Sequence, residues 1–284
     1  MKSLYEGETC AVPVLGQKSL AALEAAKCLK VCVLASGSKG NAIYISDGET
    51  SLLLDAGLSA REIEARLALR GLYPHDLTAI LISHHHSDHV KGIGPMSRRY
   101  GLPVYTLPAT LDNCRLGNLK KVCYFEKGRA FAINSLSVHA FDTPHDAVDS
   151  VGFVITAHGL KMGVATDLGV VTNVVREHLR GCQLLIMEAN HDVEMLMDGP
   201  YPWYLKQRVK SRSGHLSNED CCAFLGEIMH DALEHVIFAH LSETNNTPAK
   251  VREVMRPLFA AAGIDFTVAA QSCPTEIIIV RPKD

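Results

Sequence analysis

The sequence lacks any long apolar run, and no stretch reaches the roughly 18–20 residues that a membrane-spanning helix needs. Met1–Cys10 carries acidic residues and lacks the charged-then-apolar design of a secretory signal. Hydrophobic residues make up 47% and charged residues 21% of the 284 positions, which is ordinary for a soluble globular protein. We therefore expect a cytoplasmic protein whose chain forms one large core.

The nine cysteines include no pair at CxxC spacing, so the sequence does not predict a thiolate zinc site. Their odd number also argues against secretion and favours reduced, mostly buried thiols. The net charge of −3 gives no overall attraction to nucleic acid. Binding of a polyanion would therefore have to depend on local patches of charge.

Residues 1–30 are interpreted as an N-terminal extension of unknown role, with a helix over Lys18–Leu29, and residues 31–284 as one domain. Hairpin turns are predicted at Asp47-Gly48 and at His158-Gly159. Strands are expected at 30–35, 42–45, 51–54, 78–83, 103–106, 160–165, 183–187, 235–239 and 276–280. Several short strands are also expected within 121–156, one of them at 137–141. Helices are expected at 59–70, 90–100, 172–180, 193–212, 218–230 and 248–262. Each half thus offers strands and then helices, an order that suits two sheets packed face to face with helices outside.

The strongest signal is the segment His84-His85-His86-Ser87-Asp88-His89, which directly follows the apolar strand at 78–83. A loop leaving a strand end can turn neighbouring side chains toward one point, whereas a straight strand would spread them over two faces. Imidazole and carboxylate groups together suit zinc or a similar divalent ion. A lone histidine is usually a core residue, but four potential ligands within six residues indicate a metal site.

This HxHxDH pattern, preceded by Asp55-Ala56-Gly57, resembles the signature of the metallo-β-lactamase superfamily, and the likeness extends over almost all of residues 31–284. The segments at 35–41, 214–218 and 240–246 resemble the YycJ/WalJ (VicX-type) branch, which is known as cytoplasmic DNA exonucleases of bacteria. The resemblance implies a four-layer αβ/βα sandwich of the α/β (α+β) class, with two divalent metal ions at one edge of the sheets.

The resemblance also implies the remaining ligands. His84 and His86 would share one ion with His145, Asp88 and His89 would hold the second with His240, and Asp167 would bridge both. Taken singly, His145 could be a loop histidine, Asp167 a turn former and His240 a strand-end cap. The histidine-rich set favours zinc, while the bridging carboxylate tolerates manganese.

Catalytic roles follow from the same likeness. Asp88 would orient the attacking water or take its proton, and His215 would protonate the leaving oxygen. Glu188 would support His215, as in the glutamate–histidine pair of the tRNA 3′-processing nucleases. The alternative is that 214–218 only starts a helix capped by Ser217. His85 should point away toward solvent, and His191 is left outside the metal set.

Candidate substrate contacts fall in three segments, and each has a structural alternative. The small residues of 36–41 would cradle a phosphate or form a tight turn. Cations near Tyr201, Trp203 and Tyr204 would bind a single strand or form a solvated helix face. The contacts predicted from these segments and from the loop after His240 are Ser36, Ser38, Asn41, Arg208, Arg212, Ser242 and Asn245.

We therefore predict a metal-dependent nuclease, most specifically a 5′-to-3′ DNA exonuclease with the repair role that the resemblance implies, acting on DNA rather than RNA. The alternative is a small-molecule hydrolase such as a glyoxalase II-like thioesterase. That class adds a helical substrate-binding region after the last metal histidine, and only residues 241–284 follow His240. A regulatory module with a silent metal site is disfavoured because every ligand is present. Oligomeric state is not predicted.

Overall fold

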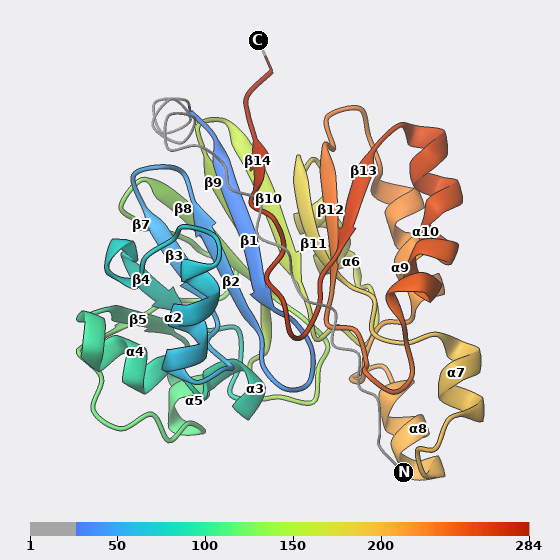
Figure 1. Cartoon of the computed structure of the whole chain (residues 1–284), viewed down its shortest axis with the longest axis horizontal. Helices are drawn as coiled ribbons and strands as arrows, with labels where there is room; N and C mark the ends of the chain where they lie inside the picture. The colour runs from blue at the N-terminus through green and yellow to red at the C-terminus, as the bar shows by residue number, and fades with distance from the viewer. Residues whose placement is uncertain (1–26, 284) are drawn as a thin grey trace, which may run out of the picture.

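The computed structural model describes residues 27–283, which form two seven-stranded sheets packed face to face with helices on their outer sides (Figure 1). This arrangement confirms the predicted αβ/βα sandwich. Positions 18–26 of the expected N-terminal helix lie outside the described residues, and its last position, Leu29, begins a strand. The division between residues 1–30 and 31–284 stays a prediction. None of the described helices has the length and apolarity that crossing a membrane requires.

The first sheet has the strand order β14-β1-β2-β3-β4-β5-β6, and the second has the order β13-β12-β11-β10-β9-β8-β7. The first consists of β1 (Leu29–Ala35), β2 (Ala42–Ser46), β3 (Ser51–Leu54), β4 (Ala79–Leu81), β5 (Pro103–Thr106), β6 (Lys121–Tyr124) and β14 (Ile278–Val280). The second consists of β7 (Ala130–Ile133), β8 (Leu136–Asp142), β9 (Val151–Ala157), β10 (Leu160–Ala165), β11 (Leu184–Glu188), β12 (His235–Ala239) and β13 (Asp265–Val268).

Helices cover the outer face of each sheet. The first sheet is covered by α2 (Ala60–Ala68), α3 (Ser87–Val90), α4 (Ile93–Tyr100) and α5 (Pro108–Asp112), with a 3₁₀ turn, η1, at Pro74–Asp76. The second is covered by α6 (Asn173–Leu179), α9 (Asn218–Ile228) and α10 (Pro248–Ala262), while α7 (Val193–Asp198) and α8 (Trp203–Val209) lie at the lower right of Figure 1.

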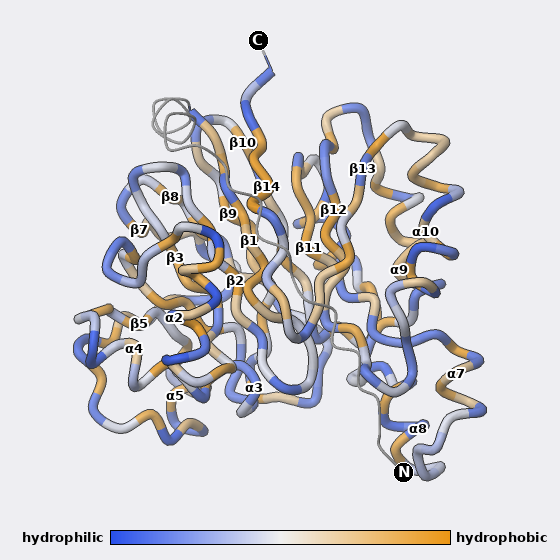
Figure 2. The backbone as a smooth tube through the Cα atoms, viewed as in Figure 1, coloured by the Kyte–Doolittle hydropathy of each residue, from blue (hydrophilic) through white to orange (hydrophobic). Residues whose placement is uncertain are grey.

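The core is divided into layers by the alternation of side chains along the strands. In β1, Val31 and Val33 belong to the cluster between the two sheets. Cys32 and Leu34 point the other way and pack with Ile63 of α2. Figure 2 shows the central strands as predominantly hydrophobic, as expected for strands buried on both faces.

Two expected helices are interrupted. The helix expected at 90–100 begins only at Ile93, as α4, and Val90 instead ends the short helix α3. The two are separated because the Gly92 N–H donates to the carbonyl of Ala56 at 2.6 Å. The helix expected at 193–212 is divided into α7 and α8, and Pro202 is the N-cap of the second part. Strand β13 and helix α5 were not predicted, since both are short and lack strong periodicity.

Parallel strand pairs bring the candidate site residues to one edge of the two sheets. The strands β3, β4 and β5 run parallel in the first sheet, and β10, β11 and β12 run parallel in the second. The carboxyl ends of parallel strands meet at the same edge of a sheet. Asp55, Asp167 and His240 follow three of these strands, and each has a positive φ of 56–58°. Such left-handed backbone is uncommon outside glycine and clusters at functional sites.

The Asp55-Ala56-Gly57 turn packs directly against the backbone of the 84–89 loop. The Ala56 N–H donates to the carbonyl of His89 at 2.7 Å, and the Asn41 N–H donates to the carbonyl of Asp88 at 2.8 Å. A Cβ atom at Gly57 would lie 1.6 Å from the Asp88 carbonyl oxygen. Only glycine therefore allows the turn and the loop to approach this closely.

We expect Gly57→Ala to lower the free energy of unfolding by about 3 kcal/mol, because two backbone segments would have to separate. Chemical denaturation measures this change. The matched control is Gly226→Ala on the exposed face of α9, where the nearest heavy atom to an added Cβ is 3.9 Å away. That variant should be neutral or more stable by up to about 1 kcal/mol. Equal stability of the two variants would contradict the role given to Gly57.

Candidate metal centre

Seven predicted side chains converge at the shared edge of the two sheets. His84, His86 and His145 form one group, and Asp88, His89 and His240 form a second. The ligand atoms within each group lie within 4.8 Å of one another. Asp167 joins His84 and His89 in a third group, so its carboxylate lies between the first two. The structure thus brings together every residue that the sequence assigns to metal binding.

The donor atoms fit divalent cations. Nε2 of His84, Nε2 of His240 and Oδ2 of Asp167 are buried and have no hydrogen-bond partner among the described residues. Buried polar atoms without partners are rare in folded proteins and require an explanation. Imidazole nitrogens and carboxylate oxygens aimed at common points are the donors that bound divalent metals use. The donor set does not by itself select one metal.

The charge states of His84 and Asp167 suit metal binding. Burial and the neighbouring imidazoles hold the pKa of His84 well below its usual range, which keeps the ring neutral. Burial alone would raise the pKa of Asp167, but the imidazoles of His240 and His89 hold it well below its usual range. A neutral imidazole and an ionised carboxylate are the forms that bind metals. His89 and His240 would have to lose a proton on binding, because burial alone would lower the pKa of each ring but Asp167 raises both.

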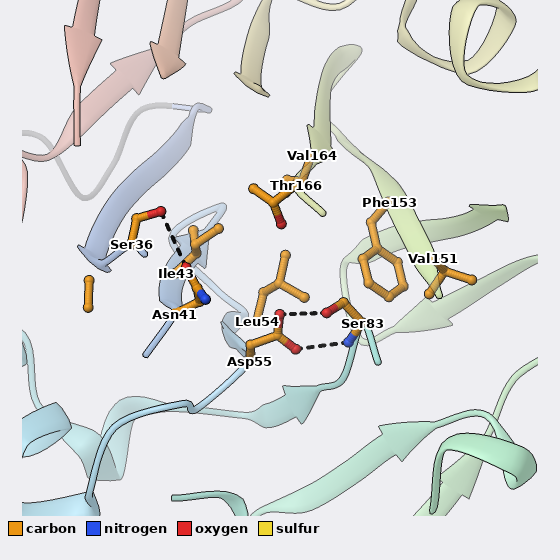
Figure 3. Close-up of a pocket in the computed structure, with 11 residues that line it drawn as sticks. Ser36, Asn41, Ile43, Leu54, Asp55, Ser83, Val151, Phe153, Val164 and Thr166 are labelled. Carbon is orange, nitrogen blue, oxygen red and sulfur yellow. Dashed lines mark hydrogen bonds between the residues drawn. The ribbon is translucent and has the colours of Figure 1, made fainter. Parts of the chain in front are cut away.

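Asp55 orients His89 and was not predicted as a site residue. Its carboxylate accepts from Nδ1 of His89 at 2.7 Å, which directs Nε2 of that ring toward the metal groups. It also accepts from the backbone N–H of Ser83 at 2.8 Å and from the Ser83 hydroxyl at 2.7 Å (Figure 3). A carboxylate behind a ligating histidine fixes the ring and raises its basicity. The sequence feature that could have predicted this role is the Asp55-Ala56-Gly57 motif, which precedes the histidine-rich segment.

A small cavity of about 10 Å³ lies next to Asp55, as Figure 3 shows. Its polar wall includes Ser36, Asn41 and Ser83, and its apolar wall comes from β2, β3, β9 and β10. This volume is close to the minimum that one water molecule requires. This cavity therefore marks the boundary between the apolar core and the metal centre and offers no room for a substrate.

Glu188 lies at the end of β11 and is completely buried. Its Oε1 accepts from Nδ1 of His215 and from Nδ1 of His240, both at 2.8 Å. Its Oε2 accepts from two backbone N–H groups, those of Leu168 and Leu216. Burial alone would raise the pKa of Glu188, but the two histidines lower it, so the carboxylate is ionised. Glu188 thus forms the predicted pair with His215, and it also forms a hydrogen bond with His240 that the sequence did not predict.

His215 forms a further group of close ligand atoms with Asp167, Glu188 and His240, and it remains partly exposed. Its ring centroid lies 5.2 Å from that of His145 and 5.1 Å from that of His240. Burial alone would lower the pKa of His215, but the Glu188 carboxylate more than offsets this and raises it. The ring is therefore prepared to carry a proton at the edge of the site.

Asp146 is a site residue that the sequence reasoning missed, although it directly follows His145. Its Oδ1 lies 3.3 Å from Nε2 of His145 and 3.9 Å from Nε2 of His86. Its Oδ2 accepts from Nε of Arg208 at 2.7 Å. Asp146 thereby anchors the exposed guanidinium of Arg208, on α8, next to the first histidine group.

The predicted substrate contacts of the 36–41 loop divide into buried and exposed residues. The Ser36 hydroxyl accepts from the His240 N–H at 2.6 Å, and Nδ2 of Asn41 lies 3.0 Å from Nε2 of His89. Both side chains are buried, so these bonds favour the tight-turn alternative. Ser38 is exposed at the tip of the loop.

Three other predicted substrate contacts, Ser242, Asn245 and Arg212, differ in how far they are buried. Ser242 is buried and accepts from the Asn245 N–H at 3.1 Å. The side-chain amide of Asn245 is buried with no hydrogen-bond partner among the described residues. Arg212 is exposed.

Two histidines stay outside the metal groups, as expected. His191 is buried, and burial lowers its pKa to about 4. His85 is half-buried and lines a cleft together with residues of α3, α4 and the segment after α5. That its ring points toward solvent stays a prediction.

Comparison with known proteins supports the fold and the family. The model of the Beta-lactamase superfamily domain matches residues 50–241. The chain is 37% identical over 222 residues to Exodeoxyribonuclease YycJ of Bacillus anthracis, covering 77% of this chain and 84% of that protein. It is 35% identical over 249 residues to Exodeoxyribonuclease WalJ of Streptococcus pneumoniae serotype 2, covering 84% of this chain and 93% of that protein.

Solved structures show the same fold at low sequence identity. The metallo-β-lactamase fold protein YhfI of Bacillus subtilis superposes with a TM-score of 0.68 at 18% identity, covering 87% of this chain and 99% of that one. Zn²⁺-bound PqqB of Methylobacterium extorquens gives a TM-score of 0.64 at 21% identity, with the same coverage of 87% and 99%. From its matched domain, its relatives and its histidine–carboxylate groups, the chain belongs to the metallo-β-lactamase superfamily and to its YycJ/WalJ branch.

Proposed function

We propose that this protein is a metal-dependent 5′-to-3′ DNA exonuclease with a role in DNA repair. The observation that carries the proposal is the pair of ligand groups joined by Asp167, with the Glu188-bound His215 at their edge. The relatives with 35–37% identity are named exodeoxyribonucleases, which supports DNA as the substrate. We infer two zinc ions from the five imidazoles, with manganese as the metal that the bridging carboxylate also tolerates.

When bound, two divalent ions lower the pKa of a shared water and neutralise charge on a phosphodiester. Asp88 has a partly exposed carboxylate whose Oδ2 lies 3.7 Å from Nε2 of His89 and 3.9 Å from Nε2 of His240. From this position it orients the attacking water and accepts its proton. His215 donates a proton to the leaving oxygen, and Glu188 fixes the orientation of the ring and stabilises its charge.

The face around α8 supplies contacts to a single strand. Arg208 is exposed and aimed by Asp146, and Arg212 follows in the exposed loop before His215. Trp203 and Tyr204 have 60% and 71% of their surface exposed, which is unusual for large aromatic residues without a partner. Cations that pair with phosphates and aromatic rings that stack on bases are the elements of single-strand binding.

A thioesterase of the glyoxalase II type is less well supported. That class needs a helical region after the last metal histidine to bind its substrate. In the described part of this chain, the segment after His240 forms α10, β13 and β14, which complete the two sheets and their cover. Nothing is left there to form a separate substrate-binding region.

Removal of metal should abolish DNA degradation and lower the melting temperature. The ligands are buried, and a ligand that binds only the folded state stabilises it by mass action. Elemental analysis of the protein as isolated should give about two divalent ions per chain. Dialysis against a chelator, followed by a melting scan and by re-addition of zinc or manganese, tests both effects. Full activity and an unchanged melting temperature without metal would contradict the proposal.

Asp88→Ala should reduce the degradation of 5′-phosphorylated DNA by about 10³-fold or more, because a ligand and a proton acceptor are lost together. End-labelled single- and double-stranded substrates measure the rate and also show its polarity. Asp112→Ala, at an exposed aspartate of α5, is the matched control and should keep full activity. Hydrolysis of S-lactoylglutathione without any degradation of DNA would instead support the thioesterase.

His215→Ala should slow turnover by about 10²–10⁴-fold while leaving the metal content intact. The matched control is His75→Ala at an exposed histidine of η1, which should change neither quantity. Single-turnover kinetics and elemental analysis on the same samples separate the possibilities. Loss of metal would show that His215 is a ligand, and unchanged turnover would leave only a structural role at the start of α9.

A further inference from the structure

A basic cleft lies beside the metal centre, and the proposed mechanism does not use it. Its volume is about 640 Å³, and its walls are α3 with the residues next to it, α4 and the loop after α5. We define it by its polar lining residues, His85, Ser87, Lys91, Arg98, Asn113 and Arg115. His85 and Ser87 alternate along the chain with the predicted ligands His84, His86 and Asp88. The basic cleft and the metal centre therefore share one loop.

The charge in the basic cleft has one sign. Within residues 27–283, its lining includes three cationic side chains and no aspartate or glutamate. Lys91 and Arg115 are exposed, and neither forms an ion pair with any residue in that range. Many cations elsewhere are paired, as Lys127 is with Asp142 and Asp149. An anion is the complementary ligand for such a cleft.

The walls of the basic cleft are fixed before any ligand binds. Nη1 of Arg98 donates to the carbonyls of Leu116 at 3.0 Å and Asn118 at 3.1 Å, which holds the loop after α5 against α4. Nδ1 of His85 is buried and has no hydrogen-bond partner among the described residues. Ser87, two residues further along the chain, lines the same cleft.

The size and position of the basic cleft indicate a polymer rather than a small ion. Its volume exceeds what one phosphate fills, so the cleft can hold a phosphate together with the neighbouring sugar. Figure 1 places α3 and α8 along the same lower edge of the molecule, α8 belonging to the second sheet's side and α3 to the first. A strand that crosses the metal centre from α8 would next meet the basic cleft.

We infer that the basic cleft binds the sugar–phosphate backbone of the nucleic-acid strand, at nucleotides beyond the phosphodiester that is cleaved. The inference rests on the proposed function, because it extends the substrate path of that site. Lys91 and Arg115 pair with strand phosphates. Val90 and Leu116 give the cleft an apolar surface for the sugar.

The test is the double variant Lys91→Ala/Arg115→Ala, assayed for binding of a hydrolysis-resistant, phosphorothioate-linked single strand. Fluorescence anisotropy at a series of salt concentrations should show about tenfold weaker binding at low salt. The slope of log affinity against log salt should decrease by about 1.4, since each lost phosphate contact on a single strand contributes about 0.7. Lys91→Glu alone should weaken binding in the same direction.

Two controls separate this role from general effects. Arg256→Ala/Arg281→Ala removes the same charge at exposed positions outside the cleft and should leave affinity and slope unchanged. The cleft variant should also keep wild-type metal content and wild-type turnover of bis(p-nitrophenyl) phosphate, because that small diester reaches only the metal centre. Loss of metal together with affinity would overturn the inference, since the loop itself would then be damaged.

The remaining outcomes are equally decisive. Unchanged affinity and slope in the cleft variant would overturn the inference even if the wild-type protein degrades DNA. Weaker binding with the smaller slope would support it, whether or not hydrolysis is seen. In that last case, a wild-type protein that binds strands but cleaves none would refute the proposed exonuclease and leave the binding role of the cleft intact.

Discussion

The backbone contact between the Asp55-Ala56-Gly57 turn and the 84–89 loop is the constraint on which the metal centre depends. The loop carries four of the seven predicted ligands, and its carbonyls at Asp88 and His89 accept from Asn41 and Ala56. Asp55 then fixes the ring of His89 from behind. Because β3 and β4 are parallel neighbours, the turn and the loop necessarily leave the sheet at the same edge.

A second carboxylate performs the same task on the other sheet. Glu188 holds His240 and His215 with one oxygen and two backbone N–H groups with the other. A buried carboxylate is costly unless its charge is fully compensated, and here both oxygens are. The two sheets therefore each contribute one buried acid that orients histidines toward the shared edge. Metal binding and the packing of the sandwich are coupled through Asp55 and Glu188, because neither acid would be stable there without its histidine.

Local patterns sufficed to predict most strands, the hairpins and the first four ligands, since each depends only on neighbouring residues. His145, Asp167 and His240 required the family likeness, because spacing alone does not reveal that β8, β10 and β12 end at one edge. Asp146 was missed since its importance comes from Arg208, 62 positions away. Ser36 was expected to contact substrate, yet its hydroxyl supports His240 across 204 positions. Contacts of this kind depend on sheet register, which no short pattern records.

The proposed substrate path has two regions, the basic cleft and α8, and both carry positive charge. The protein carries a net charge of −3, so nucleic acid gains nothing from the molecule as a whole. Cations without carboxylate partners occur in the basic cleft, while on α8 Arg208 is aimed by Asp146 toward the metal groups. On the proposed path, the basic cleft and α8 therefore supply the local positive charge beside the edge where the ligand groups converge.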